Sequence, residues 1–305
     1  EPTNACNLKC GMCSREYGNR QIGFMDAGLF EAIVSQLSYG PLAVTLHLSG
    51  EPLLHPELPD MVRKVTDAGL HAVFSTNGAL LTPEISGKLL GAGLRALRVD
   101  FTSNREKFDF ARGRTDWDKV YNNIRTLLRM REEAGLHFPL VRLHVLCFGE
   151  SDMEAQSDVA ALRRLFDDRP PDGIEIVRAH SWAGSYARAL RESGQYEVSV
   201  KRGRVTPCSH LWSSLVICWD GKVVPCCRDL NAEMVVGDLT RQTLAEVWRG
   251  GPLAEMRRLH ARGEFEEIEL CQSCSRPYEN QSLLANALRY PFRKVSSLVR
   301  GVLDR

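Results

Sequence analysis

The sequence predicts an α/β protein: an open, partial (β/α)6 barrel of the TIM type, followed by a small cysteine-rich module. Three observations support this prediction. Between about residues 40 and 180, short β-branched runs alternate with longer helical patterns. The expected strands have one apolar and one polar face. After about residue 195 this strand–helix alternation changes to a cysteine-containing pattern. Strand–helix alternation at this spacing is typical of right-handed βαβ units in a parallel sheet.

The composition limits the function classes. The chain has 305 residues, of which 44% are hydrophobic and 25% charged, and its net charge is +1. These values indicate a globular protein, and the neutral balance excludes nucleic acid as the main partner because phosphate binding needs a basic surface. No apolar run is long enough for a transmembrane segment and no signal peptide opens the chain, so we expect a cytoplasmic location.

The elements of the barrel follow from hydrophobic periodicity. Strands are expected at Ala43–Leu48, His71–Ser75, Ala96–Phe101, Leu140–Leu146 and Gly173–Val177, and helices at Asp26–Leu37, Pro56–Ala68, Pro83–Leu90, Trp117–Glu133 and Asp152–Phe166. If Glu1–Asn4 ends one more strand, six βα units are present, too few to close an eight-stranded barrel. The chain starts abruptly at that strand, so we expect a native segment before Glu1.

The polar face of these strands predicts what the barrel encloses. Apolar residues alternate with Arg98, Asp100 and Thr102 on one strand and with Arg142 and His144 on another. Since the apolar face must pack under helices, the polar set lies inside. Closed barrels fill their interior with branched aliphatic residues. A charged interior therefore indicates a wide cavity for a polar ligand, and the alternative is an internal network of ion pairs.

The second module reads as a β-hairpin followed by helices. Leu215–Cys218 and Lys222–Val224 flank a turn at Gly221, and Leu244–Trp248 and Leu253–Arg262 are helical in pattern. The tail Leu283–Arg305 is basic and amphipathic; we expect it to pack as a helix, the alternative being a membrane-surface or partner contact. The expected boundaries are 1–195 for the barrel, 196–280 for the cysteine module and 281–305 for the tail.

Ten cysteines are present, and the first group has a distinctive spacing. Cys6, Cys10 and Cys13 follow an expected strand end in the order C-x3-C-x2-C. Three thiolates on one short loop can hold three corners of a [4Fe–4S] cluster and leave one iron open to a small chelating molecule. A zinc site is the alternative, although zinc favours paired C-x2-C spacing and a fourth ligand nearby.

This loop resembles that of the radical S-adenosylmethionine (SAM) superfamily, and flanking motifs agree over residues 1–180. Ser49-Gly50-Glu51-Pro52 resembles the second-strand motif of the family, Ser75-Thr76-Asn77-Gly78 its third-strand motif, and Arg112-Gly113-Arg114 followed by Trp117 the segment after its fourth strand. All lie at the carboxyl ends of expected strands, where parallel α/β sheets bind ligands.

The resemblance implies the chemistry of the first site. SAM chelates the open iron, an electron from the reduced cluster cleaves it, and a 5′-deoxyadenosyl radical takes hydrogen from a substrate; a flavodoxin- or ferredoxin-type reductant is expected. The implied SAM contacts are Met12, Ser49, Gly50, Glu51, Pro52, Thr76, Asn77, Asp100, Thr102 and Arg114. Asp100 stands where the family has a serine, and Thr102 where it has an aspartate.

The second cysteine group comprises Cys208, Cys226, Cys271 and Cys274, and its spacing suits zinc or a cluster. In this setting it resembles the twitch module of radical SAM enzymes, a shortened SPASM domain that carries one auxiliary [4Fe–4S] cluster. The spacing is similar to that of the aminocyclitol dehydrogenases of butirosin biosynthesis. With four protein ligands the auxiliary cluster has no open iron, so it would accept or relay an electron, as a two-electron oxidation requires.

Three cysteines are left over. Cys227 adjoins Cys226 and could compete with it as a ligand, whereas Cys147 has the parity of the outward-facing residues and is predicted to be structural. Cys218 lies on the hairpin that leads to the auxiliary site. A thiol there could return hydrogen to a substrate radical, which would make the protein an epimerase; plain burial is the alternative.

Substrate contacts are predicted at Arg142, Arg178, His180 and Trp182, since arginine offers paired donors and tryptophan a flat stacking surface. The sequence thus predicts a radical SAM oxidoreductase or epimerase acting on a small polar metabolite, of the sugar or aminocyclitol type, as in natural product biosynthesis. The alternatives are a peptide-modifying radical SAM maturase, which forms thioethers or epimerises residues, and a non-catalytic zinc-binding protein.

Overall fold

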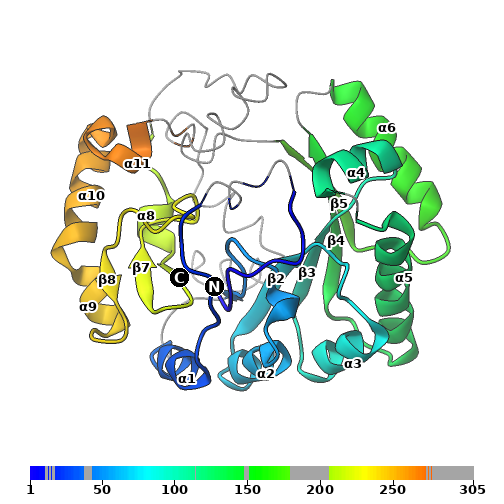
Figure 1. Ribbon diagram of the computed structural model, residues 1–305, viewed down its shortest axis with the longest axis horizontal. Helices are drawn as coiled ribbons and strands as arrows, with labels where there is room; N and C mark the ends of the chain where they lie inside the picture. Colours follow the sequence, from blue (N-terminus) through cyan, green and yellow to red (C-terminus); the bar gives the residue numbers. More distant parts are fainter. Residues whose placement is uncertain are drawn as a thin grey trace, which may run out of the picture.

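The computed structural model describes residues 1–10, 13, 15, 18–37, 43–113, 115–147, 151–178, 206–272, 274 and 276. These residues form a larger module around a parallel sheet and a smaller one around a short antiparallel sheet, and the N-terminus lies between the two (Figure 1). The predicted tail 281–305 lies outside the described residues. Within the described ranges, no helix is both long and apolar enough to cross a membrane.

The larger module contains the five predicted strands in sequential order. They are β1 (Ala43–Thr45), β2 (His71–Thr76), β3 (Ala96–Asp100), β4 (Leu140–Cys147) and β5 (Gly173–Arg178), and every neighbouring pair is parallel. Sequential parallel strands with helical crossovers on one face curve into a partial barrel, as predicted.

A sixth strand at Glu1–Asn4 is absent from the described part of the sheet. This segment instead makes an isolated antiparallel bridge between Thr3 and Phe24. Its backbone oxygens serve other partners, because Pro2 accepts a hydrogen bond from Met25 N at 2.7 Å and Ala5 accepts one from Glu51 N at 2.8 Å. The segment therefore ties the edge of the barrel to its loops.

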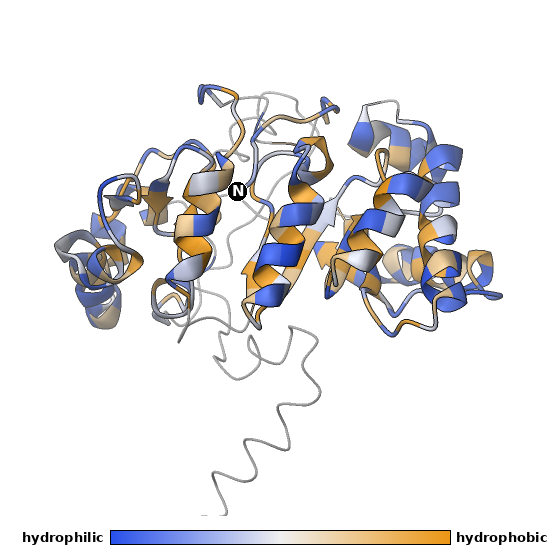
Figure 2. Ribbon diagram, turned by 90° about the horizontal axis from the view of Figure 1, so that it is seen from below, coloured by the Kyte–Doolittle hydropathy of each residue, from blue (hydrophilic) through white to orange (hydrophobic). Residues whose placement is uncertain are grey.

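Helices cover the outer face of the sheet. They are α1 (Ala27–Ser35), α2 (Leu58–Asp67), α3 (Pro83–Gly91), α5 (Trp117–Glu133) and α6 (Asp152–Leu165), all of which were predicted. A further helix, α4 (Arg105–Arg112), was not predicted; it follows β3 and contributes Arg112 to the lining of the cavity described below. Local capping sets their limits: the Asn104 side chain accepts from Lys107 N at the start of α4, and Gly113 ends it in the left-handed conformation at φ 65°. These helices alternate hydrophilic and hydrophobic residues along their length (Figure 2).

The core lies between the sheet and these helices. Along β4, Val141, Leu143, Val145 and Cys147 are buried against them, whereas Arg142 and His144 point to the other side. The predicted parity of the strand is thus confirmed, and Cys147 is a core residue. The polar face of the sheet is left free to build a site.

The smaller module contains the predicted hairpin. Strands β6 (Val216–Ile217), β7 (Lys222–Val224) and β8 (Gly237–Asp238) form an antiparallel sheet, and Gly221 makes the turn at φ 87°. The helical part comprises α8 (His210–Ser213), α9 (Leu244–Arg249), α10 (Gly251–Arg262), the 3-10 turn η4 (Phe265–Glu267) and α11 (Glu269–Gln272). A capping box between Thr243 and Glu246 starts α9.

The Glu1 side chain joins the two modules. Its buried carboxylate pairs with Arg20 at 2.7 Å, accepts from Ser49 Oγ of the barrel at 2.8 Å, and accepts from Trp219 N of the hairpin at 3.2 Å. Nearby, the Trp219 ring lies directly over Gly23, where a Cβ would come within 2.4 Å of it. The hairpin is therefore packed against the same segment that leads into the first cysteine loop.

Candidate functional site

The first cysteine group lies on a tight loop above the sheet. Cys10 is buried, Cys6 and Cys13 are half-buried, and Cys13 N donates to Cys10 O at 2.9 Å. Burial raises the pKa of the Cys6 and Cys10 thiols, and for Cys10 the charge of Arg112 opposes this rise. Buried thiolates become favourable when iron supplies the positive charge, so this donor set fits a cluster. These three cysteines would hold it.

Two glycines allow other loops to approach this one. A Cβ on Gly50 would lie 2.3 Å from Thr3 O and 2.6 Å from Ala5 O, and a Cβ on Gly113 would lie 2.7 Å from Lys9 O. Such distances exclude any side chain. Gly50 therefore packs the second-strand motif against the entrance of the cysteine loop, and Gly113 packs the end of α4 against its middle.

Glu51 connects the motifs at the ends of β1 and β2. One carboxylate oxygen accepts from Leu53 N at 3.1 Å and Thr76 Oγ1 at 2.7 Å, and the other accepts from Asn77 N at 2.8 Å. Burial raises the pKa of Glu51, although these hydrogen bonds favour its ionised form. Asn77 Nδ2 then donates to Asn7 Oδ1 at 2.9 Å. The two motifs and the cysteine loop thus form one hydrogen-bonded unit.

The residues around Glu51 fix the conformation of the segments that follow β1 and β2. Pro52 starts the 3-10 turn η2 (Pro52–Leu54), for which Glu51 is the N-cap. Ser49 is engaged with Glu1, as described above. His47 accepts from Ser75 N at 3.1 Å, and burial lowers its pKa to about 3, so it is neutral.

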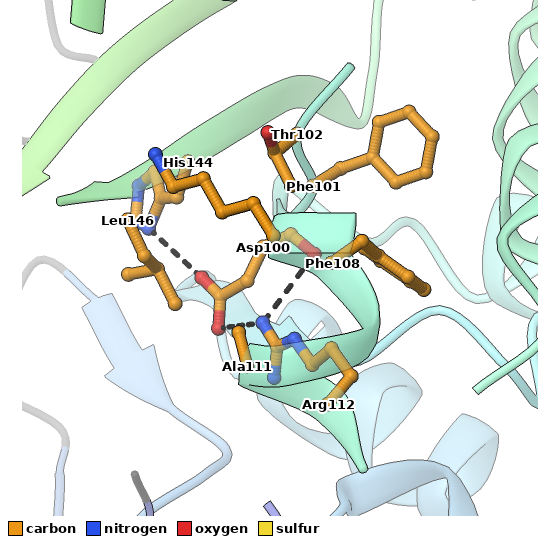
Figure 3. A pocket seen from close by; sticks show the side chains of 9 residues that line it. Asp100, Phe101, Thr102, Phe108, Ala111, Arg112, His144 and Leu146 are labelled. Carbon is orange, nitrogen blue, oxygen red and sulfur yellow. Dashed lines mark hydrogen bonds and ion pairs between the residues drawn. The ribbon is translucent and has the colours of Figure 1, made fainter. Parts of the chain in front are cut away.

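Charged side chains line a cavity on the inner face of the sheet (Figure 3). Asp100 lies between Arg112 Nη2, 2.6 Å away, and His144 Nδ1, 3.4 Å away. Beyond His144, Glu175 lies 3.5 Å from Nε2 and pairs with Arg142. The described side chains thus form the internal ion-pair network that the sequence left as an alternative. Two atoms of this chain of groups, Arg142 Nε and His144 Nε2, are buried without a hydrogen-bond partner among the described residues, although His144 Nε2 has its ion-pair contact with Glu175.

The ion pairs shift the protonation equilibria of this network. Burial acts to raise the pKa of Asp100, but Arg112 and His144 hold it well below its usual range. Hydrogen bonding to His144, with Arg142, lowers the pKa of Glu175 to about 2 despite burial. Burial lowers the pKa of His144, and the hydrogen bonds to both carboxylates outweigh it, so the pKa is raised overall. The raised pKa favours the charged imidazolium form of His144 between the two carboxylates.

Two predicted contact residues use their polar groups on the helices, although Thr102 also lines the cavity. The Thr102 hydroxyl donates to Asp158 of α6, and its carbonyl accepts from Trp117 Nε1 at 2.8 Å, because the chain has left β3 at Asp100. Arg178 pairs with Asp152 at the start of α6 and is 54% exposed. The structure therefore brings Arg142 to the interior and leaves Arg178 on the outer side. Met12, Arg114, His180 and Trp182 lie outside the described residues.

The second cysteine group lines a cavity in the smaller module. Cys208, Cys226, Cys271 and Cys274 share it with apolar residues, including Leu211 and Met256, and with polar ones, including His210, Arg228, His260 and Arg276. Burial raises the pKa of these thiols where a shift occurs, in Cys271 to about 12. Among the described residues, no three His, Cys, Asp or Glu side chains converge on one metal ion. Four thiols spread around a cavity suit a cluster, which these residues would hold.

Arg228 and His260, which the sequence did not single out, contact these thiols. Arg228 Nη1 lies 3.2 Å from Cys274 Sγ. His260 receives a hydrogen bond from Cys208 N at 3.3 Å, and its Nε2 lies 3.5 Å from Cys271 Sγ. Burial lowers the pKa of His260 to about 4. Arg228 has a signal in the sequence, since it directly follows two cysteines, whereas His260 lies eleven residues before Cys271 and is linked to it only by the fold.

The remaining cysteines differ in their surroundings. Cys218 is fully buried and lies near Glu1 and Arg20, and burial raises its pKa to about 12. It lines neither of the two cavities described above. Cys227 is near Cys226 and Cys274 but is not among the residues that line the auxiliary cavity. Their roles stay predictions.

Two family models match the chain. The radical SAM superfamily matches residues 1–161, and the SPASM family, an iron–sulfur cluster-binding domain, matches residues 208–275. The first match contains the cysteine loop and both strand-end motifs, and the second contains all four auxiliary cysteines.

Curated relatives carry different activities. An AdoMet-dependent heme synthase of Methanosarcina barkeri is 35% identical over 90% of this chain and 89% of its own. A tungsten-containing aldehyde ferredoxin oxidoreductase cofactor-modifying protein of Pyrococcus furiosus is 27% identical over 81% and 79%. An S-adenosyl-L-methionine-dependent 2-deoxy-scyllo-inosamine dehydrogenase of Niallia circulans is 23% identical over 90% of each chain.

Solved structures show the same fold. The crystal structure of BtrN in complex with AdoMet and 2-DOIA superposes with a TM-score of 0.59 at 18% identity, covering 90% of each chain. The parallel sheet, the three-cysteine loop and the four-cysteine module therefore have one explanation. The chain belongs to the radical SAM superfamily, and it is an enzyme that uses SAM and two [4Fe–4S] clusters, one of them in a C-terminal SPASM-type module.

Proposed function

We propose that this enzyme oxidises a small polar metabolite of the aminocyclitol or sugar type. The observation that carries the proposal is the auxiliary cavity, which four thiols line. A cluster bound by all four would have no open iron for a substrate. A fully ligated cluster suits electron transfer, which the second half of a two-electron oxidation needs. The 23% identical dehydrogenase, which matches over nearly the whole chain, acts on a substrate of this class according to its name and supports the proposal.

The cofactors supply the difficult chemistry, and the protein binds and orients the cofactors and the substrate. When bound, SAM and the two clusters supply a 5′-deoxyadenosyl radical for hydrogen abstraction and an acceptor for the second electron of the substrate. Cys6, Cys10 and Cys13 hold the first cluster, and the hydrogen bonds of Glu51 keep the strand ends around it in one arrangement.

The inner face of the sheet provides the polar contacts for a substrate. The ionised carboxylates of Asp100 and Glu175 accept hydrogen bonds from hydroxyl or ammonium groups, and Arg142 donates them. Since Arg142 Nε is buried without a hydrogen-bond partner among the described residues, a ligand oxygen here would satisfy it.

The test is substrate-dependent formation of 5′-deoxyadenosine. Reconstituted enzyme, held under anaerobic conditions with dithionite and SAM, is incubated with aminocyclitols, sugars, iron porphyrins or short peptides. The proposal expects an aminocyclitol or sugar to raise 5′-deoxyadenosine above the substrate-free level, with deuterium transfer from the labelled carbon and a ketone product. Turnover confined to peptides would contradict it and establish the maturase alternative. Replacing dithionite by flavodoxin or ferredoxin tests the expected reductant.

Haem synthesis is the second candidate, because the heme synthase of Methanosarcina barkeri is 35% identical over 90% of this chain. The same panel separates the two. A response to the iron porphyrin alone, with haem as the product, would support this candidate and reject the first.

Epimerisation would need a hydrogen donor, and Cys218 is the proposed one. Its raised pKa keeps it as a thiol, the form that can return a hydrogen atom. Replacement by Ala should then convert an inverted product into an oxidised or stalled one. An unchanged product stereochemistry in Cys218→Ala would remove this residue from the reaction.

A further inference from the structure

We propose that His260 and Arg228 are positioning residues that raise the reduction potential of the auxiliary cluster, through hydrogen bonds to the sulfurs of Cys271 and Cys274. The inference deepens the proposed function, on which it rests for the role of this cluster as an electron acceptor. It concerns two side chains that touch ligands and would not themselves touch substrate.

The hydrogen bond from Cys208 N sets the tautomer of His260. A backbone N–H can only donate, so Nδ1 of His260, 3.3 Å away, must present its lone pair. The ring proton is therefore on Nε2. That atom lies 3.5 Å from Cys271 Sγ, a geometry suited to an N–H···S hydrogen bond. One neutral ring thus orders the backbone of one cluster ligand and donates to the sulfur of another.

The fold holds this ring in place. His260 lies in the last turn of α10, is 1% exposed, and stacks on Phe265 with ring centroids 5.7 Å apart and planes at 24°. A ring buried in this way cannot turn away to find water. Its donor therefore stays aimed at the sulfur in both oxidation states.

Arg228 acts on a different sulfur with a full charge. It follows the Cys226-Cys227 pair in the chain and places Nη1 3.2 Å from Cys274 Sγ, with the residue only 9% exposed. Hydrogen bonds to cluster sulfurs and nearby positive charge both stabilise the reduced form, which carries one more negative charge. A charged donor has the larger effect because charge-assisted hydrogen bonds are stronger.

Paired substitutions distinguish the role of His260 Nε2 as a donor to Cys271 from the role of Nδ1 as an acceptor for Cys208. In His260→Gln the amide group can take the place of Nε2 and donate to Cys271, whereas in His260→Asn the side chain is too short to do so and retains only the acceptor for Cys208. Arg228→Gln removes the charge. His71→Asn, at the first residue of β2, and Arg258→Gln, in an exposed pair with Glu255, are the matched controls.

The measurement is a redox titration of the reconstituted holoenzyme followed by electron paramagnetic resonance. Added SAM shifts the signal of the first cluster and so identifies the auxiliary one. At a fixed solution potential, we expect the reduced-to-oxidised ratio of the auxiliary cluster to fall about tenfold in His260→Asn and further in Arg228→Gln, where tenfold corresponds to about 59 mV for one electron. His260→Gln should stay near the wild type, as should both controls.

A second measurement uses the wild-type enzyme and therefore does not depend on whether a variant folds. Electron–nuclear double resonance on the reduced wild-type enzyme, in H2O and in D2O, should show exchangeable protons coupled to the auxiliary cluster. Their absence, or an unchanged ratio in both His260→Asn and Arg228→Gln with the cluster retained, would overturn the proposal. Unchanged potentials with normal aminocyclitol oxidation would reject only this inference, whereas shifted potentials without such oxidation would reject only the proposed function.

Discussion

The guanidinium of Arg112 bridges Asp100 and Cys10: it pairs with the carboxylate at 2.6 Å and hydrogen-bonds the sulfur. Arg112 is itself buried at the end of α4, next to the glycine that packs against the cysteine loop. The ion-pair network of the barrel interior therefore extends to Cys10, which is expected to bind the first cluster.

Arg112→Gln should weaken the first cluster without unfolding the sheet. The substitution removes the positive charge that counteracts the effect of burial on the Cys10 pKa. It also removes one of the two partners of Asp100 and leaves His144 as the other. We expect a loss of about 10- to 100-fold in SAM cleavage, the usual range for groups that support metal ligands. Assays of 5′-deoxyadenosine measure it. Arg105→Gln, which breaks an exposed pair with Asp118, is the control; an equal loss there would argue against a specific role.

Cys10→Ala should lower the iron content from about eight to about four per chain and abolish 5′-deoxyadenosine formation, because only the auxiliary cluster remains. Iron and sulfide analysis of anaerobically reconstituted protein measures it. The matched variant is Cys147→Ala, which removes an equally buried thiol from the core. It should keep about eight irons while losing some stability, and a loss of iron there would contradict the assignment of Cys147 as structural.

Gly50→Ala should destabilise the protein by about 3 kcal/mol or more, because the new methyl group would overlap the backbone oxygens of Thr3 and Ala5. Gly91→Ala is the opposite case. No atom lies within 4 Å of a Cβ at this last residue of α3, so alanine should be neutral or stabilise the helix by up to about 1 kcal/mol. Anaerobic denaturant titration of both variants checks the contrast. Equal stabilities would show that the loops can move apart.

His144 should make stability depend on pH. Its folded pKa is raised above the unfolded value of about 6.5, so its ion pairs contribute fully below that pH and are lost as the pH rises through the folded value. The melting temperature of the wild type should exceed that of His144→Gln most at about pH 6 and least at about pH 9. Glu175, with a pKa of about 2, does not titrate in this window. A difference that grows with pH would contradict the assignment.

Periodicity and spacing predicted much of this molecule because they are local properties of the chain. The alternation along β4 identified its buried face, and the cysteine spacing predicted two cluster sites, which the matched family models also imply. Side-chain contacts between segments that are far apart in the sequence could not be predicted in this way, because they depend on how the elements pack. The position of Arg178 illustrates this, since it sits at the predicted strand end but with the parity of Cys147, and so pairs with Asp152 on the helical side. The position of His260 beside Cys271 likewise depends on how α10 packs.

The buried carboxylate of Glu1 has a consequence for domain shuffling. Because it simultaneously engages Arg20, Ser49 and Trp219, the cysteine module is not a cassette that can be exchanged between relatives by joining chains at a linker. A chimera that imports a foreign C-terminal module also needs the matching N-terminal segment and the glycine under the Trp219 ring. Evolution of the two halves is thereby constrained to proceed together, even when the substrate changes.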